Sequence, residues 1–347
     1  MAAAKDIPIG FEAFSIPRAR QRRGEGDRFM VQYSGLEYRA YRPENQSSCR
    51  TGPSGSPKNP EEIMNDSSYQ SSLEKGIKHL GNRWDPEAVE FLNENLGSRL
   101  GCLNVLFSDS KSQSLRSWFA LDNLEDHKQW AYVAAKIQRM IFQAEPWRWL
   151  PAFAHLFPLL SDNENVINWY SRHRLPFFVE DEERGNEAVN KDDVNRVAFH
   201  SYQLHLALLG KWGELHERCE KILSAPETPE GKDFLIDHRF YLALAEGNKP
   251  AMEVALNRLT SPDVARIRNF GVAFGLTENL IATHATIYAK VAWRSGYEVE
   301  IDSPWVPREW LPVKPLNNYD EPWPFLQDFD VWQPFEGDWA VWSPQNC

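Results

Sequence analysis

The sequence pattern of one helical hairpin occurs twice between Phe199 and Ser261, and this repeat constrains the fold more than any other feature. The first copy holds Leu206-Ala-Leu-Leu-Gly, and the second holds Leu242-Ala-Leu-Ala-Glu-Gly. The first helices align from residue 206 to 242, an offset of 36 residues, and the second helices from 215 to 252, an offset of 37. Helix–turn–helix repeats of about 34–40 residues are typical of stacked αα solenoids.

The repeat predicts tetratricopeptide-like hairpins over residues 186–296, with one extra residue in the turn of the second copy. A further apolar helix over residues 279–295, followed by Gly296, resembles the first helix of a third hairpin. The alternative is a chance similarity between two amphipathic hairpins. Solenoids of this kind usually present a surface to another protein and rarely carry chemistry.

The preceding segment, residues 61–185, reads as a helical domain. Asp66 is a candidate helix cap, and Asp85-Pro86 places a capping residue before proline at the first helical position. Apolar residues then recur every three or four positions from Val89 to Phe107, which predicts one continuous helix. Further helices are expected over residues 122–143 and after Asp162, which we predict to be a cap.

Residues 1–60 form a separate N-terminal arm in this prediction. Alternating apolar residues over 29–41 flank Ser34-Gly35 and predict a small β-hairpin. A stretch rich in Ser, Pro and Gly over 45–60 reads as a linker. The basic run of residues 18–23 is either a solvated arm or a localisation or nucleic-acid signal.

Residues 297–347, called the C-terminal strap from here on, have an unusual composition. They contain eight prolines and eleven aromatic residues. Proline opposes a long helix, and disordered tails are poor in aromatic residues. We therefore predict an irregular segment that packs along the helices through its Trp and Phe side chains. The complete fold prediction is a mainly α-helical array with a β-hairpin at its start and this strap at its end.

The charge is unevenly placed along the chain. The formal net charge is −11, and the strap contributes ten acidic and two basic residues to it. Residues 1–60 carry ten basic and six acidic residues. Nucleic-acid binders usually show a basic field, so this distribution disfavours direct nucleic-acid binding and favours a basic protein as partner.

The cysteines and the apolar runs point to a cytoplasmic protein. The four cysteines, at 49, 102, 219 and 347, are far apart and form no dense disulfide framework. The N-terminus lacks the apolar core of a signal peptide, and no window approaches 18 uninterrupted apolar residues. We expect no membrane partner.

The strap also holds the candidate partner-binding residues. Its tryptophans are of the type that anchors protein interfaces, and its carboxylates can steer association with a basic partner. The candidates are Trp305, Trp310, Asp320, Glu321, Trp323, Asp328 and Asp330. The alternative is a strap that packs on its own protein while its charges only solvate it. Both interpretations hold if the aromatic residues face inward and the acidic residues face outward.

No catalytic, cofactor-binding or metal-binding residue is predicted. Phosphate-binding glycine loops, nucleophile elbows and zinc-protease motifs are absent from the sequence. His216 and Cys219 share a helix face but supply only two ligands, whereas a metal needs three or four. An enzyme remains a third hypothesis, which a pocket lined by His200, His205 or His238 with a converging carboxylate would revive.

Residues 190–330 resemble the all-α immunity proteins of bacterial polymorphic toxin systems, including those paired with type VI secretion nuclease effectors. The resemblance rests on His200-Ser-Tyr-Gln-Leu-His-Leu-Ala-Leu-Leu-Gly-Lys-Trp212, the second hairpin, and the segment from Ala285 to Pro312. In that segment a late helix ends in glycine and an extended Val-Glu-Ile-Asp-Ser-Pro piece follows. Trp310-Leu311 stands where plain aliphatic residues are expected, and residues 1–60 have no counterpart.

The resemblance implies a non-enzymatic inhibitor that binds a toxin in the producer's cytoplasm and blocks or distorts its active site. An acidic surface suits a nuclease, because a nuclease needs a basic groove to hold phosphates. The alternative function is a helical-repeat adaptor with a partner that is not a toxin. A toxin gene beside this one would separate the two.

Overall fold

The computed structural model describes residues 66–80, 86–146, 148, 151–177, 191–224, 234–268 and 280–342. All of them belong to one compact unit, residues 60–347. The described residues form helices and irregular segments and include no β-strand, so the mainly α-helical prediction is confirmed. The predicted arm of residues 1–60, with its β-hairpin, lies outside the described residues.

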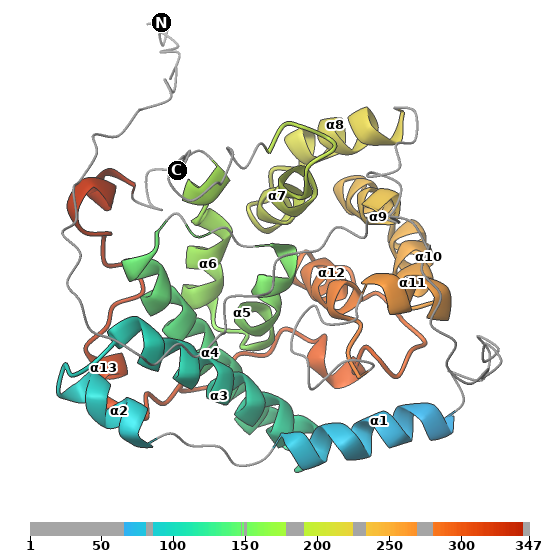
Figure 1. The fold of residues 1–347 in the computed structure, drawn as a ribbon. Helices are drawn as coiled ribbons and strands as arrows, with labels where there is room; N and C mark the ends of the chain where they lie inside the picture. The colour runs from blue at the N-terminus through green and yellow to red at the C-terminus, as the bar shows by residue number, and fades with distance from the viewer. Residues whose placement is uncertain are drawn as a thin grey trace, which may run out of the picture. The chain divides into compact units, whose positions relative to one another are not determined.

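The first part of the unit is built around two long helices that pack side by side (Figure 1). Asn123 caps the second of them by accepting a hydrogen bond from the Asp126 N–H at 3.0 Å. Shorter helices pack around this pair. The elements are α1 (Asp66–His79), α2 (Pro86–Asn93), α3 (Arg99–Phe119), α4 (Leu124–Ala144), η2 (Ala152–His155), α5 (Leu156–Leu160), α6 (Glu164–Arg172) and η3 (Leu175–Phe177).

The predicted continuous helix from Val89 to Phe107 is wrong, because the chain turns between α2 and α3. Asn95 and Gly97 have φ angles of 56° and 63°, in the left-handed region that ends helices. Ser98 then starts α3 as its cap and accepts a hydrogen bond from the Gly101 N–H at 3.2 Å. Leu96, which the apolar pattern placed inside, is 48% exposed in this turn.

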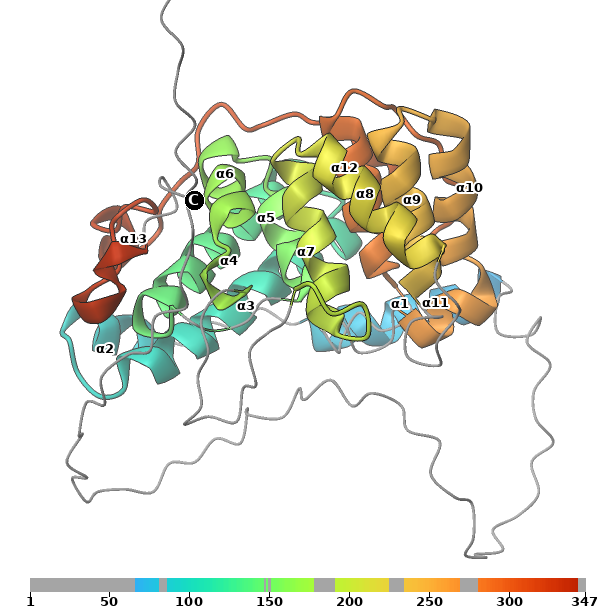
Figure 2. The same cartoon turned by 90° about the horizontal axis from the view of Figure 1, so that it is seen from above.

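The second part contains two successive helix pairs and a further helix. These elements are α7 (Val197–Leu208), α8 (Trp212–Leu223), α9 (Leu235–Ala245), α10 (Lys249–Leu259), α11 (Pro262–Arg268) and α12 (Thr283–Arg294). Helix α9 packs against both α8 and α10, and α12 packs against α10 and α5 (Figure 2). The hairpins therefore exist where the repeat predicted them; their tetratricopeptide-like character remains a prediction.

Three helices of this part end in the same way, at Gly210, Gly247 and Gly296. Each glycine has a positive φ angle, 65°, 70° and 89° respectively. In each case its N–H bonds the carbonyl three residues back, and the next N–H bonds the carbonyl five residues back, which is the Schellman motif. The first two motifs are 37 residues apart, so Leu206 matches Ala243 and the two turns have equal length. The predicted extra residue in the second turn is wrong.

The glycine at 247 is under a tighter constraint than the glycine at 210. A Cβ atom at 247 would lie 2.7 Å from the Tyr297 hydroxyl oxygen, whereas the nearest atom at 210 is 3.7 Å away. We expect Gly210→Ala to cost about 1–2 kcal/mol through its left-handed backbone. Gly247→Ala should cost roughly 1 kcal/mol more, because Tyr297 must move. Urea unfolding of both variants tests this, and equal costs would contradict the steric argument.

Helix α4 contributes to both hydrophobic cores of the unit. Its Ala131 and Ala134 pack in a core shared with α5, α7–α10 and α12. Its Val133, Ile137 and Met140 pack in a second core with α2, α3 and α6. The first core draws on residues from Leu80 to Leu311, so the predicted segments 61–185 and 186–296 share it.

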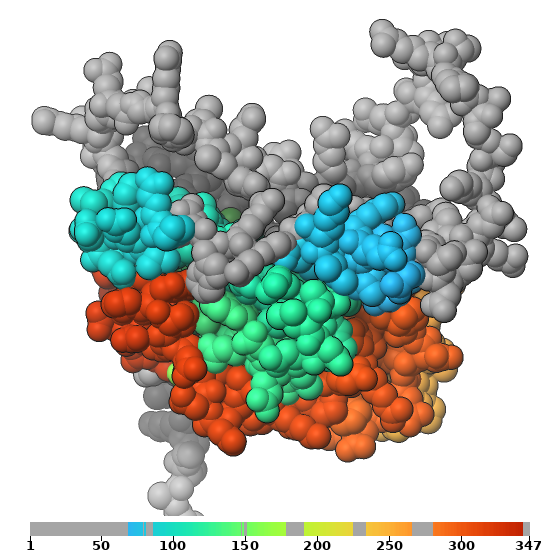
Figure 3. All heavy atoms as spheres, turned by 90° about the horizontal axis from the view of Figure 1, so that it is seen from below, coloured from blue at the N-terminus to red at the C-terminus, as the bar shows by residue number. Residues whose placement is uncertain are grey.

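The C-terminal strap runs across one face of the unit and is described as far as residue 342. It contains only short helical pieces, η7 (Arg308–Trp310), α13 (Pro324–Gln327) and η8 (Gly337–Val341). It leaves α12, passes along the α3–α4 pair and reaches α2, which α13 contacts. Figure 3 shows it as an orange-to-red band. Its buried aromatic side chains are Trp310, Trp323, Phe325, Phe329 and Phe335.

Candidate protein-interaction surface

The strap turns nearly all of its carboxylates outward. Nine of its ten acidic residues are exposed, and within the described part of the chain none of the nine takes part in an ion pair. Unpaired carboxylates on a fixed backbone produce a negative field that does not depend on local rearrangement. The nine residues are Glu298, Glu300, Asp302, Glu309, Asp320, Asp328, Asp330, Glu336 and Asp338.

Three of the four predicted partner-binding carboxylates belong to this exposed set. Asp320, Asp328 and Asp330 are all exposed. The fourth, Glu321, points toward α4. Its Oε1 accepts a hydrogen bond from the Tyr132 hydroxyl at 2.7 Å and forms an ion pair with Lys136. Burial and this carboxylate both raise the pKa of Tyr132, so the phenol stays a donor. Glu321 therefore attaches the strap to α4.

The predicted tryptophan anchors lie mostly inside the protein. Trp310 is 1% exposed and stacks on His127 with ring centroids 4.6 Å apart. Trp323 is 7% exposed and stacks on Phe325 at 5.5 Å. Trp305 is partly buried against the first core. The aromatic residues thus hold the strap to its own protein, and Trp310 and Trp323 are not available to a partner as surface anchors.

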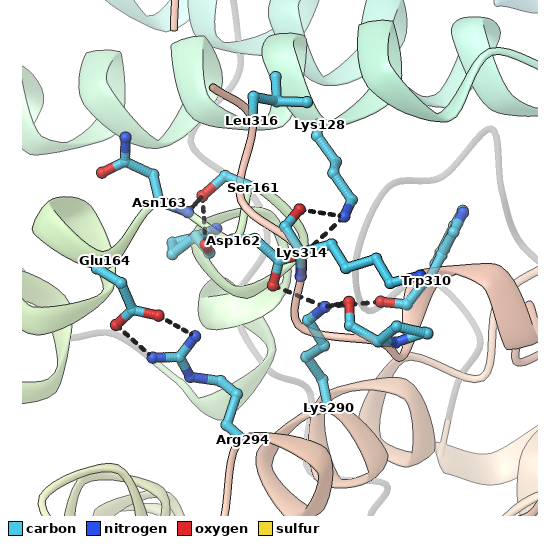
Figure 4. Close-up of polar contacts among 12 residues, drawn as sticks. Lys128, Ser161, Asp162, Asn163, Glu164, Lys290, Arg294, Trp310, Lys314 and Leu316 are labelled. Atoms are coloured by element: carbon cyan, nitrogen blue, oxygen red, sulfur yellow. Dashed lines mark hydrogen bonds and ion pairs between the residues drawn. The ribbon is translucent and has the colours of Figure 1, made fainter. Parts of the chain in front are cut away.

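A buried ion cluster attaches residues 310–314 of the strap to α4, to α12 and to the turn between α5 and α6 (Figure 4). The Asp162 carboxylate lies between the ammonium groups of Lys128, at 2.8 Å, and Lys290, at 2.7 Å. All three side chains are at most 5% exposed. The ammonium groups also donate to strap carbonyls, Lys128 to Lys314 and Lys290 to Trp310 and Pro312, at 2.7–3.0 Å.

The cluster carries two positive charges for one negative charge in the interior. Burial lowers the pKa of Lys290 to about 8, and the Asp162 carboxylate opposes that shift. The strap carbonyls supply the remaining acceptors, because an ammonium group has three protons to donate. Removal of this part of the strap would therefore leave two buried cations with unsatisfied donors.

The predicted role of Asp162 as a helix cap is wrong. Asn163 caps α6 instead, accepting a hydrogen bond from the Val166 N–H at 3.1 Å. Asp162 has a φ angle of 55° and turns its carboxylate into the interior, where it also accepts from the Lys314 N–H at 3.2 Å. The one available sequence signal was Lys290, a lysine between the apolar residues Ile287 and Val291 of α12.

A second set of polar groups, near the repeat helices, is entirely internal. His200 Nδ1 lies 2.7 Å from His238 Nε2, and His238 Nδ1 lies 3.8 Å from the Cys219 sulfur. Phe234 stacks on His200 with centroids 4.0 Å apart. Burial raises the pKa of Cys219 to about 12, so its thiol is protonated at neutral pH and is no nucleophile. These side chains pack α7, α8 and α9 together.

His205, the other histidine of the enzyme hypothesis, lies apart from that pair. Its ring is fully buried and meets His155 edge to face at 5.0 Å. Among the described residues, no group of three or more His, Cys, Asp or Glu side chains is placed to hold a metal ion. No described helix is both long and apolar enough to cross a membrane.

Comparison with known proteins returns no relative. No protein family model matches this chain, and no curated protein and no solved structure matches it.

Proposed function

We propose that this protein is an immunity protein that binds a basic toxin domain, a nuclease, in the cytoplasm and neutralises it. The observation that carries the proposal is the set of nine exposed, unpaired carboxylates along the strap. A nuclease must hold a phosphate backbone, so its substrate groove is positively charged. Carboxylates on an inhibitor can occupy such a groove and exclude the nucleic acid.

The attachment of the strap supports this use of its charges. Trp310, Trp323 and the Asp162 ion cluster hold the backbone from inside, so the outer carboxylates are fixed before a partner arrives. A surface that is already ordered loses less conformational entropy on binding. Complementary charge also raises the association rate, which matters for an inhibitor that must act before the toxin cleaves its substrate.

The direct test is charge reversal at the exposed residues of the strap. In Asp320→Lys/Asp328→Lys/Asp330→Lys, affinity for the toxin should fall about 10–100-fold at low salt, because three attractive charges become repulsive. Glu321 is left unchanged because its reversal would break the contact with Lys136. The measurement is calorimetric titration of the neighbouring gene's product, inactivated at its catalytic site.

A control with the same charge change keeps the test specific. Glu214, Glu217 and Glu220 are exposed on α8, and Figure 1 shows α8 at the opposite side of the unit from α13, the strap helix nearest to the three mutated aspartates. Changing all three to lysine should alter affinity by no more than about threefold. That small effect is what remains of a long-range charge interaction after screening by salt. Equal losses of affinity in the two variants would show that the strap is not the contact surface. A tight partner that is not a toxin would favour the adaptor function.

A further inference from the structure

Helix α4 binds the strap through a row of polar side chains, and most of them contact the strap backbone. Gln129 exchanges two hydrogen bonds with the backbone of Asp320, at 2.7 and 3.0 Å. Arg139 donates to the carbonyls of Val331 and Gln333 at 2.8 and 2.7 Å. Gln143 donates to the Pro334 carbonyl at 2.9 Å. The contacts follow the same order along α4 and along the strap.

Arg139 shows that this face of α4 is built for a peptide backbone. Its side chain is fully buried, and within the described residues it has no carboxylate in an ion pair. Its guanidinium lies over the rings of Trp169 and Phe335, 4.4 and 4.9 Å from their centroids. A buried cation needs acceptors, and here backbone carbonyls of an irregular segment supply them.

Side chains of the strap add selectivity to this backbone contact. Glu321 reaches Tyr132 and Lys136 on α4. The residues that follow it, Trp323, Phe325 and Phe329, enter the second core together with α2, α4 and α6. The result is one carboxylate followed by aromatic side chains at fixed spacings, held on a backbone with little regular structure. This is how extended peptides are recognised in many complexes, by backbone bonds plus a few side-chain sites.

We propose that this face of α4, from Gln129 to Gln143, is a peptide-binding site whose ligand is an acidic and aromatic peptide with the pattern of residues 319–335, including the short helix α13. In this chain the strap itself fills the site. Asn317 and Asn318, which precede the bound stretch, are exposed, so the chain can be cut between them while the contacts of residues 319–335 with α4 stay in place. A peptide with the same pattern competes for the site.

The test uses the full chain with a protease recognition sequence inserted after Asn317. The folded protein is cut there and incubated with a fluorescent peptide of residues 318–342, and binding is followed by anisotropy. We expect the labelled peptide to enter the cut protein and the unlabelled peptide to displace it. A scrambled peptide of equal composition should not bind, because its carboxylate and rings no longer match α4.

Two peptides with the same loss of charge sharpen the test. Glu321→Gln should bind at least tenfold more weakly, because it loses a charge-assisted contact to Lys136 and Tyr132. Asp328→Asn should bind within about twofold of the parent peptide, since Asp328 is exposed. The proposal is overturned if the labelled peptide does not enter the cut protein. It is equally overturned if the two substitutions weaken binding of the peptide to the same extent, because α4 would then not recognise Glu321 specifically.

Discussion

The Asp162→Asn variant should lose about 3–5 kcal/mol of unfolding free energy, because the change leaves two buried ammonium groups without their shared carboxylate. Both Lys128 and Lys290 remain in place, at most 5% exposed. The loss should also loosen the start of the strap, whose carbonyls these lysines hold. Urea unfolding measures the first effect, and the rate of tryptic cleavage after Arg308, which is exposed and followed by Glu309, measures the second.

Glu164 offers a matched control for this substitution, two residues further along the chain. It forms a two-pronged ion pair with Arg294, at 2.8 and 2.7 Å, that looks as strong on distance alone. Its side chain is 52% exposed, however, and exposed pairs contribute at most about 1 kcal/mol. Glu164→Gln should therefore cost no more than that. If the two variants lose equal stability, burial of the Asp162 cluster is not what makes it costly to break.

A pH series separates the charge effect from a packing effect in the Asp162→Asn variant. The pKa of Lys290 lies at about 8 in the intact cluster and should fall further without the carboxylate. Raising the pH toward 8 then removes one of the two uncompensated charges in the variant, while Lys290 of the parent still holds its proton. The stability difference from the parent protein should shrink as the pH rises from about 6 to 8 and level off above pH 8. A difference that stays constant over this range would point to lost packing alone.

The helical framework was predictable because its signals are local. Pro86 starts a helix and the glycines at 210, 247 and 296 end helices, each within a turn of the residues that reveal it. The failed predictions depend on distant partners. Asp162 has the position of a cap, but the lysine that draws it inward is at 290, 128 residues later. No local pattern contains that pairing.

The candidate surface was predictable in its charge and not in its anchors. An irregular segment has no period, so nothing in the strap sequence separates an inward tryptophan from an outward one. Trp310 and Trp323 are inward because hydrophobic area is available on α3 and α4. Carboxylates are costly to bury without partners, and so nearly all of them face solvent whatever path the strap takes. Glu321 departs from this rule because its carboxylate contacts Lys136 and Tyr132.

Acidification should unfold this protein steeply, because at least four histidines are buried in a neutral form. His127, His155, His173 and His205 are at most 2% exposed. Burial lowers the pKa of His127 and His155 to about 4 and that of His205 to about 3. Burial, helped by Arg139, also holds the pKa of His173 well below its usual range.

The sign of the effect follows from proton binding in the two states. An unfolded chain takes up protons on these imidazoles near pH 6.5, whereas the folded chain resists until about pH 4 or below. Stability is therefore complete above pH 6.5 and falls as the pH drops toward 4, by up to about 5 kcal/mol per pH unit when all four sites contribute. Net stabilities of domains are about 5–15 kcal/mol, so unfolding near pH 5 is expected.

Urea unfolding at a series of pH values from 5 to 8 measures this slope and hence the number of protons taken up. His205→Gln should reduce the slope by about one proton, because one buried imidazole is gone. The matched control is His216→Gln, which removes a histidine whose side chain is 36% exposed on α8, near Glu220 and Glu246. That variant should keep the parent slope. Parallel slopes in all three proteins would show that the buried imidazoles do not govern acid unfolding, and the carboxylates would then have to account for it.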